Sequence, residues 1–249
     1  MTACAGVVDW RRARCANRHN PGLLPHQRTR VDHRTRFLQL ALQAQALRFG
    51  QFTLKSGRIS PYFFNAGQFQ TGMALAQLAA CYADAVDAAG VRFHLLFGPA
   101  YKGIPLATAV ACEYARRGRD LPLAFNRKEA KTHGEGGQLI GAPLAGRRVL
   151  IVDDVITAGT AVSQALACIA DAGGIAAGIA VALDRQEALQ PEGDRRSAAD
   201  VIAQEHSVPV IAIATLDDVL HAAQNDPALT IHSQALGEYR QRYGTGAAP

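Results

Sequence analysis

This chain has little cysteine, no apolar run long enough to span a membrane, and no paired spacing of metal ligands. Its 249 residues include five cysteines, at positions 4, 15, 81, 112 and 168, and no Cys-x-x-Cys pair. An odd number of cysteines without a signal peptide favours reduced thiols over disulfides or a zinc site. The longest nearly apolar stretch, Gly173 to Leu183, is far shorter than the ~18 residues of a membrane span. These absences predict a soluble, cytoplasmic protein.

The body of the chain also lacks the positive charge that nucleic-acid binding requires. Residues 1–36 hold eight arginines and two aspartates, which gives them a net charge of +6. Because the whole chain has a net charge of +5, the remaining residues have a net charge of −1. The segment up to His33 has no hydrophobic periodicity and no apolar core of a secretory signal. An Arg-rich, acid-poor leader is also typical of a transit peptide, but this leader has no serine. We therefore expect residues 1–33 to be disordered or to precede the true start, and expect neither a nucleic acid nor a membrane as partner.

From Arg34 onward, apolar residues recur at regular periods. They predict a helix from Phe37 that stops near Gly50, two short strands at 52–54 and 62–65, and a helix at 73–89 that ends at Gly90. Strands then alternate with helices: strands at 93–97, 123–126, 149–152, 177–183 and 208–212, and helices at 104–116, 161–172 and 216–224. This alternation predicts an α/β fold with a central, mostly parallel, twisted sheet flanked by helices. We expect one domain over 34–243, with a hood at 34–70 and a core at 71–243, and a flexible tail at 244–249.

The stretch from Val149 to Ala161 carries the strongest functional signal. An aliphatic strand ends in Asp153 and Asp154, at the edge of the sheet where open α/β folds bind ligands. The turn that follows offers backbone N–H groups, a glycine and two hydroxyls at the start of a helix, which suits a phosphate. The alternative to a binding site is a buried strand that simply ends in two solvated aspartates. The string resembles the fingerprint for phosphoribosyl pyrophosphate (PRPP) in the type I phosphoribosyltransferases.

That resemblance implies the type I phosphoribosyltransferase fold and assigns roles to the stretch. Asp153 and Asp154 would contact the ribose hydroxyls and count among the catalytic residues. The 5-phosphate would lie in the loop Val155, Ile156, Thr157, Ala158, Gly159, Thr160 and Ala161. Many family members have glycine where this chain has Ala158, which is a mild departure.

A second loop, from Phe97 to Gly103, also follows a strand and precedes a helix. Alone, it could equally be a Gly-Pro loop with a surface lysine. Beside the fingerprint it resembles the pyrophosphate loop of the family, in which Tyr101 and Lys102 would contact PRPP.

Residues 126–141 form the longest polar stretch between the predicted helices and strands. They include three glycines in four positions, at 134, 136 and 137, which predict mobility. A charge run of this kind is more often a solvated surface, although long loops tend to be lids or binding segments. The segment resembles the catalytic loop of the orotate phosphoribosyltransferases, which implies that the diphosphate is contacted by Arg127, Lys128, Lys131 and His133. Lys131 and His133 would stabilise the leaving group. In that family part of the loop reaches the neighbouring subunit's site, which implies a homodimer with shared active sites.

The base would be selected elsewhere. The hairpin from Phe52 to Asn65 holds a cation and three consecutive aromatic residues, which more often form a core than a site. It resembles the orotate-binding hood of the same family, with Lys55 near PRPP and Phe63 and Phe64 on the base, and Thr157 is also implied as a contact. Arg185, at the end of a later strand, would pair with the orotate carboxylate, since a guanidinium can donate two parallel hydrogen bonds.

Together these motifs imply a Mg²⁺-dependent transfer of phosphoribose from PRPP to orotate in pyrimidine synthesis. No side chain is assigned as a metal ligand, because PRPP and diphosphate would carry the Mg²⁺. Two alternatives remain open at this point. One is an enzyme of the same fold for another base, such as uracil or a purine, and the other is a PRPP-sensing regulator without catalysis.

Overall fold

A six-stranded sheet carries the fold in the computed structural model, which describes residues 32–54, 56–131, 137–157 and 159–246. The strand order is β5-β4-β3-β6-β7-β8. The strands are β3 (Leu95–Gly98), β4 (Leu123–Lys131), β5 (Gly137–Gly141), β6 (Arg148–Asp153), β7 (Ile175–Asp184) and β8 (Val210–Thr215). Neighbouring strands pair in parallel except β4 and β5, which are antiparallel. The predicted α/β fold with a mostly parallel sheet is confirmed.

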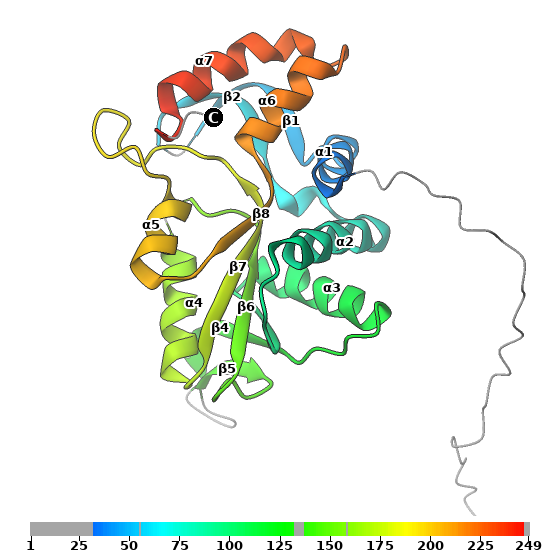
Figure 1. The fold of residues 1–249 in the computed structure, drawn as a ribbon, viewed down its shortest axis with the longest axis vertical. Coiled ribbons are helices and arrows are strands. Elements are labelled where there is room, and N and C mark those ends of the chain that lie inside the picture. Colours follow the sequence, from blue (N-terminus) through cyan, green and yellow to red (C-terminus); the bar gives the residue numbers. More distant parts are fainter. Residues whose placement is uncertain (1–31, 55, 132–136, 158, 247–249) are drawn as a thin grey trace, which may run out of the picture. The chain divides into compact units, whose positions relative to one another are not determined.

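Helices cover both faces of this sheet (Figure 1). One face packs against α2 (Gly72–Ala89) and α3 (Gly103–Arg116), and the other against α4 (Thr160–Asp171) and α5 (Ala198–His206). The central strand β6 is buried from Val149 to Asp153, as its continuous aliphatic run predicts. As expected, α2 ends at Gly90, whose φ of 66° places it in the left-handed region that glycine tolerates best. No helix in the described part of the chain is both long and apolar enough to cross a membrane.

A small antiparallel hairpin stands beyond the sheet (Figure 1). It consists of β1 (Leu47–Thr53) and β2 (Ile59–Phe64), followed by the short turn η2 (Ala66–Gln68). The hairpin packs against α1 (His33–Gln43) and α7 (Ser233–Tyr243), which follows α6 (Leu216–Asn225) and η3 (Thr230–His232). Phe49 stacks on His232 with ring centroids 4.7 Å apart. The C-terminal helix therefore packs on the predicted hood, although the two lie at opposite ends of the chain.

Several predicted elements were wrong in extent or absent. The first helix ends at Gln43 rather than near Gly50, because Leu47 already pairs with Phe64 in the hairpin. The predicted loop at 126–141 is partly an antiparallel strand pair, with Asn126 opposite Leu139 and Lys131 opposite Gly137. Neither α5 nor α7 was predicted. In α5 the buried residues are only Ala198, Ala199 and Ile202, and in α7 only Leu236 and Tyr239, which is too few for a periodic signal.

Candidate functional site

The carboxyl ends of β3, β6 and β7 supply the residues of the candidate site, at the edge where open α/β sheets bind ligands. β6 ends at Asp153, and Asp154 follows directly. Both aspartates are 7% exposed. The Tyr82 hydroxyl donates to the backbone carbonyl of Asp153 (2.7 Å), and the Ala182 N–H donates to that of Asp154 (2.9 Å). The acidic pair is therefore held by the two elements beside β6, helix α2 and strand β7.

The two carboxylates are not equivalent. Lys102 donates from Nζ to Asp154 Oδ2 at 2.7 Å, so Asp154 has a cationic partner. Asp153 Oδ1 accepts the Asp154 backbone N–H at 2.9 Å. Burial, and secondly the charge of Asp154, raise the pKa of Asp153 to about 6. The site thus combines a paired carboxylate with one that titrates close to neutral pH.

Replacing Asp153 with asparagine is expected to stabilise the protein without ligand. The pKa of Asp153 in the folded state, about 6, lies above the ordinary value of 3.8, so the folded state binds the proton more tightly than the unfolded state. The free energy of unfolding therefore falls as the pH rises from 3.8 to about 6. At pH 7 the ionised carboxyl costs about 3 kcal/mol, which a neutral asparagine side chain avoids while its Oδ1 can still accept the Asp154 N–H. Urea unfolding of Asp153→Asn and the wild type should show a gap in unfolding free energy at pH 7 that shrinks toward pH 4. The exposed Asp171→Asn is the control, and a gap independent of pH would contradict the account.

The segment between β6 and α4 has the form of a phosphate site. Val155 and Ile156 are half-buried, and Thr157 and Thr160 are exposed. Gly159 precedes α4 with a φ of 76°, and a Cβ there would lie 3.0 Å from Ile202 Cδ1. No side chain caps the start of α4, so its first N–H groups are available to an anion. Ala161 lies in the first turn of α4, and Ala158 lies outside the described residues.

At the end of the loop that follows β3, the start of α3 approaches β6 so closely that Gly103 cannot be replaced without movement. A Cβ on Gly103 would lie 2.5 Å from Pro99 Cδ and 2.8 Å from the Val152 carbonyl oxygen. The Ala100 N–H donates to Asn126 Oδ1 at 2.9 Å, which ties this loop to β4. Tyr101 is 65% exposed. The loop brings Lys102 to Asp154, as the sequence predicts for two loops at one sheet edge.

Residues of the β4–β5 pair lie beside β3. Arg127 is half-buried, and its Nη1 makes no hydrogen bond to any residue that the structure describes. Lys128 lies within β4 and Lys131 is its last residue, whereas His133 lies outside the described residues. The contacts of these four residues with diphosphate remain predictions.

The aromatic residues of the hairpin point to opposite sides of β2. Phe63 is half-buried and stacks on Phe52, with ring centroids 5.5 Å apart. Phe64 is 8% exposed and packs on Phe37 in the core. Because neighbouring residues of a strand alternate between faces, the two rings cannot meet one base from the same side. Lys55 lies outside the described residues.

Arg185, which directly follows β7, contacts both a carboxylate and an aromatic ring. Its Nε donates to Glu187 Oε1 at 2.8 Å, and its guanidinium lies over the ring of Tyr62. Tyr239 of α7 donates to the same carboxylate oxygen. Sequence reasoning missed Glu187 and Tyr239. The alternating charges of residues 184–187 were a signal for Glu187, whereas Tyr239 had none because α7 was not predicted.

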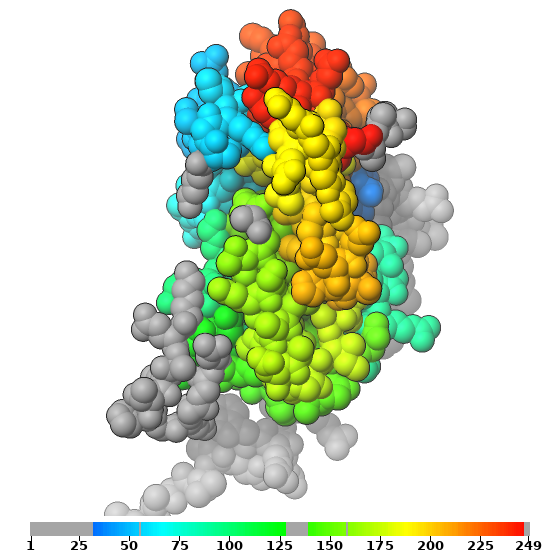
Figure 2. All heavy atoms as spheres, turned by 90° about the vertical axis from the view of Figure 1, so that its left-hand side faces the viewer, coloured from blue at the N-terminus to red at the C-terminus, as the bar shows by residue number. Residues whose placement is uncertain are grey.

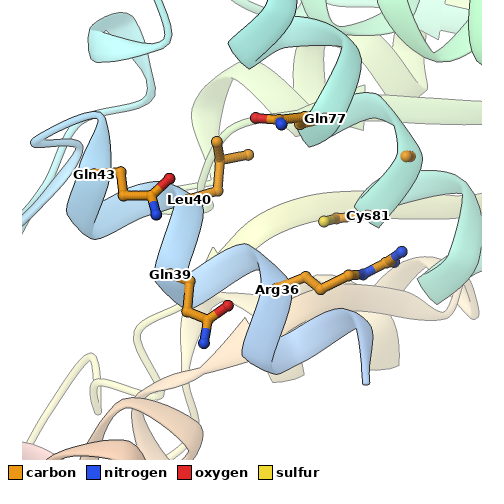
Figure 3. A pocket seen from close by; sticks show the side chains of 7 residues that line it. Arg36, Gln39, Leu40, Gln43, Gln77 and Cys81 are labelled. Atoms are coloured by element: carbon orange, nitrogen blue, oxygen red, sulfur yellow. The ribbon is translucent and has the colours of Figure 1, made fainter. Parts of the chain in front are cut away.

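A separate pocket of about 260 Å³ lies between α1 and α2 (Figure 3). Its lining contains none of the predicted site residues and consists of Arg36, Gln39, Leu40, Gln43, Gln77, Ala80 and Cys81. Arg36 is paired with Asp84 on α2. This pocket is therefore distinct from the strand-end site.

The donor set at the strand ends suits a metal that arrives with its substrate. Within the described residues there is no group of three or more His, Cys, Asp or Glu side chains that could hold an ion. Mg²⁺ is commonly bound by one or two carboxylates together with substrate phosphates and water. Asp153 and Asp154 fit that pattern, since they supply carboxylate oxygens between two candidate phosphate loops.

Comparisons with known proteins agree with this geometry. Residues 66–211 match the family model described as "Phosphoribosyl transferase domain". The chain is 71% identical over 215 residues to orotate phosphoribosyltransferase of Xanthomonas oryzae, covering 86% of this chain and 98% of the relative. It is 67% identical over 213 residues to that of Stenotrophomonas maltophilia, covering 86% and 97%. The crystal structure of orotate phosphoribosyltransferase from Francisella tularensis superposes with a TM-score of 0.74 at 40% identity, covering 84% of this chain and 99% of that one.

Proposed function

Because this chain belongs to the phosphoribosyltransferases, and among them to the orotate phosphoribosyltransferases, we propose that it transfers phosphoribose from PRPP to orotate. The products are orotidine 5'-monophosphate and diphosphate, which places this pentosyltransferase in pyrimidine synthesis. One observation carries the proposal. A buried acidic pair lies between the loop that carries Lys102, which pairs with Asp154, and the start of α4, whose backbone N–H groups suit a phosphate.

In this proposal, each of these parts has its own role in the reaction. Asp153 and Asp154 bind the ribose hydroxyls, and the start of α4 binds the 5-phosphate. N1 of orotate loses its proton and forms a bond to the anomeric carbon while the bond to the diphosphate oxygen breaks, and the departing diphosphate can take up that proton. Lys102 is exposed over 58% of its side chain, so it can turn from Asp154 toward the departing diphosphate. Arg127, Lys128, Lys131 and His133 add positive charge there, where it stabilises the transition state.

We further propose that Mg²⁺ accompanies PRPP, with Asp153 and Asp154 as the carboxylates nearest to it. When bound, the ion would neutralise charge on the diphosphate. A homodimer with shared sites is also part of the proposal, and it rests on the resemblance of residues 126–141 to the family's catalytic loop. A cytoplasmic location is supported by the free thiols of the described cysteines, Cys81, Cys112 and Cys168.

The test is an absorbance assay of the purified protein with PRPP and Mg²⁺, offering orotate, uracil and hypoxanthine separately. We expect consumption of orotate alone, and its loss when Mg²⁺ is replaced by a chelator. Turnover of a different base would be compatible with the fold but would contradict orotate as the substrate. PRPP binding without turnover of any base would instead favour a regulator.

A further inference from the structure

A polar network surrounds Arg185 where β7 ends. The Arg185 side chain is 13% exposed and that of Glu187 is 17% exposed. Nε of Arg185 donates to Glu187 Oε1 at 2.8 Å. Nη2 lies 2.5 Å from the same oxygen and belongs to the same ion pair. Glu187 therefore occupies the Nε side of the guanidinium.

The carboxylate of Glu187 is itself held by other elements. Tyr239 on α7 donates its hydroxyl to Glu187 Oε1 at 2.8 Å. Burial, and secondly the charge of Glu187, raise the pKa of Tyr239 to about 12, so this hydroxyl keeps its proton at neutral pH. Nη1 of Arg58, in the turn before β2, lies 3.9 Å from Glu187 Oε2. Glu187 thus joins the strand end, the C-terminal helix and the hairpin.

An aromatic ring sets the plane of the guanidinium. The Arg185 guanidinium carbon lies 5.1 Å from the ring centroid of Tyr62, which is completely buried. Tyr62 meets Tyr239 edge to face, with ring centroids 6.1 Å apart. Tyr239 consequently supports Arg185 in two ways, through the Glu187 carboxylate and through the Tyr62 ring.

The last turn of α7 also makes hydrogen bonds to the segment that follows β7. The Ala188 N–H donates to the Tyr243 carbonyl at 2.8 Å, and Arg195 Nη2 donates to the Gly244 carbonyl at 2.7 Å. In the space-filling view, the yellow segment after β7 lies next to the red C-terminal helix (Figure 2). The C-terminal helix is therefore held against the end of β7 by backbone contacts as well as by Tyr239.

A guanidinium can bind a planar carboxylate along its Nε side or across its Nη1 and Nη2 end. Glu187 takes the first position, where its carboxylate pairs with Nε and Nη2 of Arg185. The second position is the one left for a substrate anion. Its direction depends on how Glu187 and Tyr62 orient the guanidinium.

We propose that Tyr239 is a positioning residue for base recognition, which acts through Glu187 to aim the Nη end of Arg185 at the carboxylate of the base. The inference rests on the proposed function, because it requires an anionic base. It makes the C-terminal helix a part of the specificity site, through the hydrogen bond from Tyr239 to Glu187.

The test compares Tyr239→Phe with Tyr243→Phe. Each variant removes one hydroxyl from the same helix, but only the Tyr239 hydroxyl donates to Glu187. Tyr239→Phe should raise KM for orotate about tenfold, the usual effect of losing a hydrogen bond to a charged group. KM for PRPP and kcat at saturating orotate should stay near the wild-type values, and Tyr243→Phe should change none of the three. Thermal unfolding of both variants reports any loss of stability separately.

A coupling test separates positioning from general packing. In an Arg185→Lys background, the ammonium has no planar end to align, so adding Tyr239→Phe should change KM for orotate little further. The same tenfold rise in both backgrounds would overturn the proposal, as would an orotate KM of Tyr239→Phe equal to that of Tyr243→Phe. A wild-type protein that does not consume orotate would instead overturn the proposed function. The two failures are therefore distinguishable.

Discussion

Lys131→Ala is expected to lower kcat by about 10²–10³, because a donor aimed at charge that develops in the transition state is worth that much. Lys131 is the last residue of β4, and β4 pairs with β3, whose end leads into the Lys102 loop. The departing diphosphate carries more charge in the transition state than in bound PRPP, so the loss should appear in kcat rather than in KM for PRPP. The measurement is the initial rate at saturating PRPP and orotate. Lys131→Arg keeps the charge and should recover part of the rate, whereas unchanged turnover of Lys131→Ala would contradict the assigned role.

The same variant tests whether sites are shared between subunits. Lys131→Ala and Asp153→Asn are each expected to be nearly inactive alone. If the lysine serves the neighbouring subunit's site, an equal mixture after subunit exchange contains mixed dimers with one intact site. The mixture should then recover about a quarter of the wild-type turnover. If no activity returns although mixed dimers are detected, the lysine acts within its own subunit.

Gly103→Ala is expected to have the second large effect, on both stability and PRPP use. An added Cβ would meet Pro99 Cδ at 2.5 Å and the Val152 carbonyl oxygen at 2.8 Å, so the loop that carries Lys102 must move away from β6. Overpacking of this kind costs about 1–3 kcal/mol of unfolding free energy. A shift of about 1 Å in a binding loop can lower kcat/KM for PRPP by about 10²-fold.

Gly72→Ala is a matched control, because Gly72 and Gly103 are each the first residue of a helix. A Cβ on Gly72 meets nothing within 4 Å. Gly72→Ala should leave kcat/KM for PRPP unchanged and should not lower the unfolding midpoint. Equal effects of the two substitutions in urea unfolding and in the rate assay would show that the close approach at Gly103 does not matter.

The parts of the site that lie on regular elements were predictable from local sequence. The aliphatic run before Asp153 places the acidic pair at a strand end, because a buried parallel strand requires such a run. The glycine before α4 marks a left-handed residue at a helix start. The contact between Lys102 and Asp154 follows once both loops are placed at one edge of a parallel sheet.

The parts that depend on tertiary packing were not predictable in this way. Phe63 and Phe64 look alike in sequence, and only the register of β2 against β1 decides that Phe64 enters the core. The end of the first helix at Gln43 is decided by pairing of Leu47 with the hairpin rather than by propensity. The bond from Tyr239 to Glu187 joins residues far apart in the chain, through a helix with a weak apolar pattern.

The most direct test of the central claim follows the reaction by ³¹P NMR with PRPP, Mg²⁺ and orotate, for the wild type and for the double variant Asp153→Asn/Asp154→Asn. The wild type should form the nucleotide 5'-phosphate and free diphosphate in equal amounts. The double variant should form neither, while its circular dichroism spectrum shows that it is folded. Equal conversion of PRPP by a folded double variant would contradict the assignment of the reaction to this strand-end site.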